Sequence, residues 1–119
     1  MLIALAGVAV AAPVGVGHGA SGDVAAALKR PPLKATAQVY DSGFMAPTVT
    51  IRKGGTIKWV WDISLLDNHN VTYLKGPSKY FTSRALGSGA SFRRKFTKAG
   101  KYMIYCSLHA GNTQKIIVK

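Results

Sequence analysis

Cys106 is the only cysteine of this 119-residue chain, so it cannot form an intrachain disulfide. It follows a run of alternating residues, and a short loop brings back a histidine, His109, three positions later. A thiolate is a soft ligand that favours Cu(I), whereas an imidazole suits both oxidation states of copper. The pair therefore predicts one half of a copper site.

A second histidine is needed, because two His and one Cys in a near-trigonal plane form the ligand set of electron-transfer copper. His69 supplies it, at the start of an expected strand far upstream of Cys106. The third histidine, His18, lies in an N-terminal stretch where a ligand would have no rigid support, and we leave it out. Only a fold that packs strands distant in sequence side by side could unite His69 with Cys106.

Other interpretations of these residues explain less. A lone Cys in a strand is usually an inert core residue, but that gives no reason for a His at this spacing. A structural zinc site needs four ligands, and His69, Cys106 and His109 make three. A thiol enzyme would have its base in a tight loop with no acid to orient it. We therefore expect a metal-binding carrier and not an enzyme.

The segments that must position the site are short alternating runs, which are typical of β-strands. Within residues 48–53 the apolar side chains fall at every second position, and Ile57, Trp59 and Trp61 share one face of the next run. No helix of three turns is apparent after residue 34. The pattern predicts an all-β Greek-key β-sandwich of about seven to eight strands. The expected strands cover residues 36–40, 48–53, 56–62, 70–74, 91–96, 101–106 and 114–119.

Aromatic residues late in the chain fit the same fold. Phe92 and Phe96 share a strand face by parity, as expected for a core between two sheets. Tyr102 lies four residues before Cys106, where its hydroxyl could pin a Greek-key corner.

The N-terminal third differs from the rest in composition. Residues 1–12 are apolar, of the length of a signal-peptide core and too short to span a bilayer. Residues 13–32 are small and lack hydrophobic periodicity, as in a flexible linker. We divide the chain into a signal-like leader and linker, residues 1–33, and one domain, residues 34–119. We expect export to the periplasm, the cell surface or the medium, with the leader either cleaved or kept as a membrane anchor.

The charge of the chain is strongly positive. Sixteen Lys and Arg stand against four acids, for a formal net charge of +12. Such a surface attracts an acidic partner and repels its own copies, so we expect an acidic redox partner and a monomer. The run Arg93-Arg94-Lys95 could suggest nucleic acid, but the tryptophans share a core face with Ile57 and are not free to stack on bases.

Several spaced motifs occur in one order along residues 39–119. They are Phe44 and Pro47, Gly55-Thr56-Ile57-Lys58-Trp59, His69-Asn70-Val71, Gly100-Lys101-Tyr102 and Cys106-Ser107-Leu108-His109. In this set the chain resembles the small cupredoxins of the plastocyanin, pseudoazurin and amicyanin group. The resemblance implies that His69 and His109 bind copper through ring nitrogens and Cys106 through its thiolate. It further implies that Asn70 braces the Cys106 loop and that electrons enter and leave at the exposed edge of His109.

The sequence departs from that group at the axial ligand. Short-loop members have Met three residues after the second His, where this chain has Asn112, and longer-loop members have it at the place of Gln114. Met103 cannot replace it, because an odd offset from Cys106 points it to the opposite face of the strand. We expect an oxygen from Asn112 at this position, with Gln114, the backbone carbonyl of Asn68 or no ligand at all as the alternatives.

The sequence thus predicts a type 1 (blue) copper protein that carries single electrons through one copper ion, cycling between Cu(II) and Cu(I). The alternative is a cupredoxin-like module that binds copper for delivery or has lost copper altogether. Reversible redox cycling with a partner distinguishes these two hypotheses.

Overall fold

The computed structural model describes residues 30–119, which form a β-sandwich. These residues contain eight strands and no helix, and therefore no helix long and apolar enough to cross a membrane. The strands are β1 (Lys34–Tyr40), β2 (Gly43–Phe44), β3 (Thr48–Ile51), β4 (Gly55–Trp61), β5 (Thr72–Lys75), β6 (Ser91–Phe96), β7 (Gly100–Tyr105) and β8 (Thr113–Val118). His18 and most of the leader predicted for residues 1–33 lie outside the described residues. The leader and the exclusion of His18 as a ligand therefore stay predictions.

Two four-stranded sheets face each other, one in the order β2-β1-β4-β6 and the other in the order β3-β8-β7-β5. Parallel pairs, β1 with β4 and β3 with β8, join strands that are not consecutive in the chain. The predicted all-β sandwich is confirmed. All seven expected strands are present, and the strand missing from the prediction is β2, whose two residues are too few to show a period.

The core between the sheets follows from the alternation of side chains in the strands. In β4 the buried positions Ile57, Trp59 and Trp61 alternate with half-buried ones, as the sequence predicts. Phe92 and Phe96 of β6 both pack against Trp59, with ring centroids 6.0 and 6.4 Å away. The tryptophans are therefore core residues and do not form a surface for stacking bases.

Tyr102 pins the turn between β6 and β7. Its ring is buried, and its hydroxyl donates a hydrogen bond to the carbonyl of Lys98 at 2.6 Å. Burial raises the pKa of this phenol above its ordinary value, so it stays a donor. The predicted tyrosine corner is thus confirmed, and it fixes the start of the strand that ends at Cys106.

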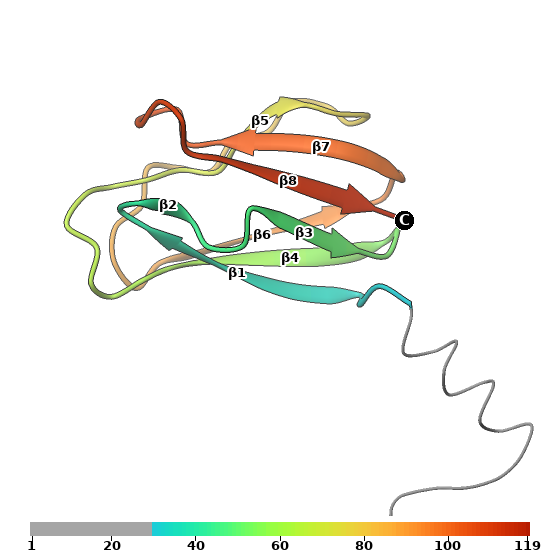
Figure 1. Ribbon diagram of the computed structural model, residues 1–119, viewed down its shortest axis with the longest axis horizontal. Helices are drawn as coiled ribbons and strands as arrows, with labels where there is room; N and C mark the ends of the chain where they lie inside the picture. Colours follow the sequence, from blue (N-terminus) through green and yellow to red (C-terminus); the bar gives the residue numbers. More distant parts are fainter. Residues whose placement is uncertain (1–29) are drawn as a thin grey trace, which may run out of the picture. The chain divides into compact units, whose positions relative to one another are not determined.

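One end of the sandwich gathers the loops that matter for chemistry. The turn after β1, the loop after β4 and the loop between β7 and β8 all lie at the left end in Figure 1, whereas the chain ends at the right. Antiparallel pairing of β7 with β8 brings Tyr105 opposite Thr113, so the loop between them is closed tightly.

Candidate metal centre

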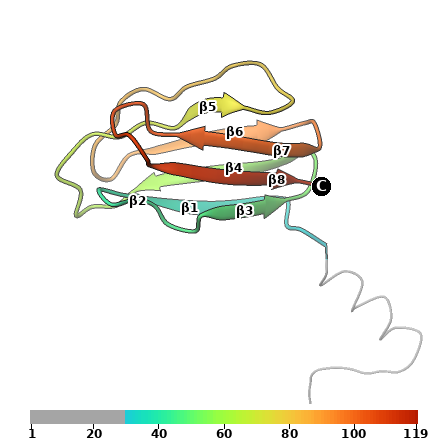
Figure 2. The ribbon, with the colours of Figure 1, turned by 45° about the horizontal axis from the view of Figure 1, so that its top comes forward.

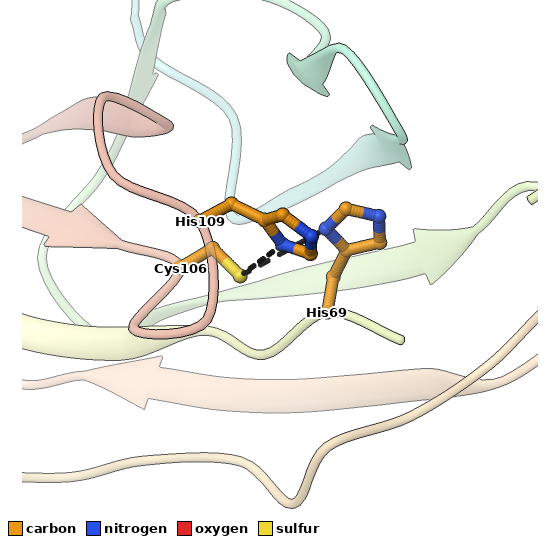
Figure 3. A group of neighbouring side chains, drawn as sticks. All are labelled: His69, Cys106 and His109. Carbon is orange, nitrogen blue, oxygen red and sulfur yellow. Dashed lines mark hydrogen bonds between the residues drawn. The ribbon is translucent and has the colours of Figure 1, made fainter. Parts of the chain in front are cut away.

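His69, Cys106 and His109 converge at this loop-bearing end. Their ligand atoms all lie within 4.8 Å of one another. The Cys106 sulfur lies 3.8 Å from Nδ1 of His69 and 3.5 Å from Nδ1 of His109. Figure 3 shows both rings turned with a nitrogen toward the sulfur. The structure therefore brings together the three residues that the sequence singled out.

His69 is fixed by its own backbone. Its N–H and carbonyl exchange hydrogen bonds with Leu86 at 3.0 and 2.9 Å, as an isolated bridge. The indole N–H of Trp61, in the core strand β4, donates to the same carbonyl at 2.9 Å. Only 1% of its surface is exposed, so the His69 ring is enclosed by the surrounding protein.

Asp41 orients that ring from outside the trio, a role that sequence analysis missed. Its carboxylate lies in the turn after β1 and accepts a hydrogen bond from Nε2 of His69 at 2.9 Å. This bond places the ring proton on Nε2 and leaves the Nδ1 lone pair facing Cys106. Asp is common in turns for conformational reasons alone, so nothing in the sequence distinguished Asp41 as a residue of the metal centre.

The same carboxylate also holds the loop after β4. It accepts the backbone N–H groups of Leu66 and Asp67 at 2.9 and 3.2 Å. The bonds from His69, Leu66 and Asp67 outweigh desolvation and lower the pKa of Asp41 below its ordinary value. Asp41 is therefore an anion at neutral pH, placed at the outer edge of His69.

Asn70 ties the His69 segment to the Cys106 loop. Its amide N–H₂ donates to the Ser107 hydroxyl at 2.7 Å, and its amide oxygen accepts the Ser107 backbone N–H at 2.9 Å. Its backbone N–H points at the Cys106 sulfur, 3.5 Å away. The bracing role that the cupredoxin resemblance implied for Asn70 is confirmed.

The loop that carries His109 is built from two tight turns. The His109 N–H bonds to the Cys106 carbonyl at 3.2 Å, and the Asn112 N–H bonds to the His109 carbonyl at 3.3 Å. Gly111 has φ +89°, a conformation that favours glycine at this place in a turn. The Cys106 N–H closes the loop on the Asn112 carbonyl at 2.9 Å. His109 is only partly buried, between exposed neighbours.

The spacing of the three ligand atoms fits a metal ion. With bonds of about 2.3 Å to sulfur and 2.0 Å to nitrogen, set about 120° apart, S and N are separated by about 3.7 Å. The observed separations are 3.8 and 3.5 Å. A thiol has one proton and cannot donate to both rings, whereas a thiolate with two imidazole nitrogens is the near-trigonal ligand set of electron-transfer copper.

Residues 33–119 match the family described as copper binding proteins, plastocyanin/azurin family. The chain belongs to this family. Its cofactor is one copper ion, in keeping with the His-Cys-His arrangement. The cupredoxin interpretation of the sequence is thereby confirmed.

Solved structures share the fold of this cupredoxin. A reduced, Cu(I) form of an amicyanin variant is 19% identical, with TM-score 0.64, 78% of this chain covered and 89% of the amicyanin. A purple cupredoxin from Nitrosopumilus maritimus is 23% identical, with TM-score 0.63 and coverage of 71% and 99%. A copper-containing nitrite reductase from Thermus scotoductus SA-01 is 29% identical, with TM-score 0.63 and 78% of this chain covered. The match spans 26% of that enzyme's chain.

Asn112 and Met103, two side chains considered for the axial position of this cupredoxin, lie in different places. The Asn112 amide oxygen lies beside Gly43 of β2, 3.4 Å from where a Cβ on that glycine would be. Met103 is on the outward face of β7, lining a hollow with Lys75 and Lys101, so it points away from the trio as predicted. An oxygen ligand from Asn112 stays a prediction.

Gln114, the weaker axial candidate, has a different role. Its amide oxygen accepts the indole N–H of Trp59 at 2.8 Å. Its amide N–H₂ donates to the carbonyls of Met45 and Ala46 at 3.2 and 2.8 Å. These bonds keep the Gln114 amide between the sheets, which removes it from the axial candidates, and they also fix the loop after β2. The Met45 side chain is 56% exposed.

Proposed function

We propose that this cupredoxin carries single electrons, with copper held by Nδ1 of His69, the thiolate of Cys106 and Nδ1 of His109. The observation that supports this most is the convergence of three ligand atoms, with the sulfur at separations from both nitrogens that suit a trigonal metal. When bound, the copper supplies the redox chemistry by changing between Cu(II) and Cu(I).

The residues around the site keep its geometry constant. Asp41 orients one imidazole, Asn70 bridges the two ligand segments, and Trp61 anchors the His69 backbone. A site whose ligands hardly move between the two oxidation states needs little rearrangement when an electron arrives or leaves. No bond of a substrate is made or broken, so the protein acts as a carrier.

Electrons cross at the His109 edge. His69 is buried, whereas His109 is partly exposed beside Leu108, which is 51% exposed. A redox protein can therefore approach the second imidazole closely. With a net charge of +12, the chain favours an acidic partner, which we place outside the cytoplasm with this protein.

Addition of Cu(II) to the purified protein tests the copper site. We expect an intense visible thiolate-to-copper band and a matching electron paramagnetic resonance spectrum. Cys106→Ala abolishes the band, because the thiolate is both ligand and chromophore. Met103→Leu is the matched control: it removes a sulfur from the outward face of the neighbouring strand and leaves the band unchanged. A Cys106→Ala protein with the same band overturns the proposal.

Redox cycling separates electron transfer from copper delivery. A carrier is reduced and reoxidised repeatedly with its copper retained, even in the presence of a Cu(I) chelator. Loss of copper to the chelator on the first reduction supports a delivery module instead. With an acidic partner, we expect transfer to be fastest at low ionic strength, because salt screens long-range attraction.

A second candidate follows from the 29% identity to a nitrite reductase, which exceeds that of the other two structures compared. In this role the copper centre of the chain itself reduces nitrite. Within residues 30–119 only the His69, Cys106 and His109 group could hold a metal through His, Cys and acidic side chains. Consumption of nitrite by the copper-loaded, reduced chain alone supports this candidate, and we expect none.

A further inference from the structure

The outward face of the β2-β1-β4-β6 sheet carries a compact set of cations. The register of β1, β4 and β6 sets two rows of outward side chains side by side. Across the strands these rows are Lys34, Thr56 and Lys95, then Thr36, Lys58 and Arg93. Most of them line a groove of about 360 Å³. We call the four cations Lys34, Lys58, Arg93 and Lys95 the basic face.

The cations of the basic face are not neutralised within the fold. No salt bridge among the described residues involves any of the four. Lys58 and Arg93 are direct cross-strand partners, and like charges at such positions destabilise a sheet. The neighbouring Arg94 instead turns inward, its guanidinium 4.3 Å from the centre of the Phe81 ring. The alternation of side chains along β6 thus points Arg93 and Lys95 outward and Arg94 inward.

The acids of the described chain lie at the other end. Asp41 follows β1 directly, whereas Lys34 begins that strand, so the two charges are a full strand length apart. Asp62 and Asp67 lie in the loop after β4, at the same end as the metal centre. The molecule is therefore polarised, with the basic rows distant from the metal centre and carboxylates around it.

We propose that the basic face rests on a lipid bilayer that contains anionic phosphate headgroups. Lysine and arginine charges with threonine hydroxyls between them suit phosphate oxygens. The face lacks the exposed aromatic or aliphatic anchors on which protein interfaces depend, since the large exposed apolar residues lie outside these two rows. It also lacks aromatic side chains between the cations, on which nucleic-acid bases would stack.

Binding in this way orients the molecule. The basic rows lie near the start of β1, and the carboxylates beside the metal centre are repelled by an anionic surface. His69 and His109 then face away from the lipid, and the partly exposed His109 stays open to a redox partner. This inference stands on the charge distribution and does not depend on the proposed electron transfer.

The test is co-sedimentation of the full chain with vesicles at low and high salt. The vesicles are phosphatidylcholine alone, and phosphatidylcholine with phosphatidylglycerol in equal parts. Lys58→Gln with Arg93→Gln neutralises the basic face. The matched control, Lys75→Gln with Lys115→Gln, removes the same charge from the outward face of the other sheet. Circular dichroism verifies the fold of each variant.

We expect salt-sensitive binding to the anionic vesicles beyond any binding to phosphatidylcholine alone. Each neutralised charge of the basic face weakens it about fivefold, so the double variant binds about 25-fold more weakly while the control pair changes little. Equal losses in the two double variants overturn the proposal in favour of attraction by net charge. The proposal is also overturned if the anionic vesicles are not preferred over phosphatidylcholine alone. It is overturned as well if polyglutamate or an oligonucleotide binds more tightly than the vesicles and this binding depends on Lys58 and Arg93. Copper is not required for the readout.

Discussion

The two histidines of the metal centre are held in opposite ways. His69 is buried and is fixed by a two-way backbone bridge to Leu86, an indole bond from Trp61 and a carboxylate bond from Asp41. His109 lies in the seven-residue loop between β7 and β8, where its own backbone makes only turn bonds, and its ring is partly exposed. Both nevertheless present Nδ1 to the Cys106 sulfur.

This difference gives the two histidines different roles in the metal centre. A ligand fixed from three sides sets the geometry, and a ligand at the surface provides the contact with a redox partner. The rigid side is built from the sandwich itself, through β4 and the turn after β1, whereas the exposed side is built from local turns. Variants that alter one side and leave the other unchanged can separate these two contributions.

The largest contrast is expected from removing each imidazole in turn. His109→Gly opens a gap at the surface, so added imidazole should enter, complete the ligand set and restore the visible band of the Cu(II) protein. His69→Gly leaves a gap that is enclosed by protein, and added imidazole should restore little. Absorption spectra during an imidazole titration measure both. Equal rescue of the two variants would show that the two histidines are not held differently.

A smaller effect is expected from Asp41→Asn, which keeps the shape of the residue and removes its charge. Loss of a carboxylate behind a metal-bound imidazole typically weakens metal affinity about 10- to 100-fold. Cu(II) should lose more than Cu(I), and each tenfold difference raises the reduction potential by about 59 mV. Redox titration and Cu(II) competition measure these changes.

Asp67→Asn is the control for this variant, since it removes the same charge from the same end without the bond to His69. If both variants shift the potential equally, Asp41 acts only through its general charge and does not orient the ring. If neither shifts it, the carboxylate has no influence on the copper.

A shift of tens of millivolts is expected on the exposed side from Asn112→Met. A harder oxygen favours Cu(II) more than a thioether does, so the Met variant should have the higher potential. Asn112→Leu, which supplies no ligand atom, should be higher still. An unchanged or lower potential in the Met variant, with copper still bound, would remove Asn112 from the site.

The smallest effect concerns acid stability without copper. The folded-state pKa of Asp41 lies below its ordinary value, as does that of Asp62, where Ser64 hydrogen-bonds the carboxylate. A depressed pKa contributes stability above the ordinary value of about 3.9, and this is lost as the pH falls through the folded-state value. Urea unfolding between pH 6 and 3, at about unit steps, should show a smaller acid loss for Asp41→Asn than for the native chain. Identical profiles would contradict a contribution from Asp41.

Much of this protein could be predicted from local patterns. Alternation along β4 predicted which side of the strand carries Trp59 and Trp61, because the period of two is a property of the chain alone. The Cys106 and His109 spacing predicted half of a copper site, since the end of one strand and the loop that follows it carry both residues. Parity alone excluded Met103 from the site, and the structure places it on the outward face.

Contacts between distant segments could not be predicted in this way. The bond between Asp41 and His69 joins two loops through the pairing of β1 with β4, and no period or spacing in the sequence encodes it. Gln114 was a weaker alternative to Asn112 at the metal on its position alone, but packing of β8 against β4 turns its amide to Trp59. The sequence by itself determined the ligand types, the strand faces and the net charge. Only the tertiary structure decided which carboxylate orients which histidine and where the charges gather, because both depend on strand register across the sandwich.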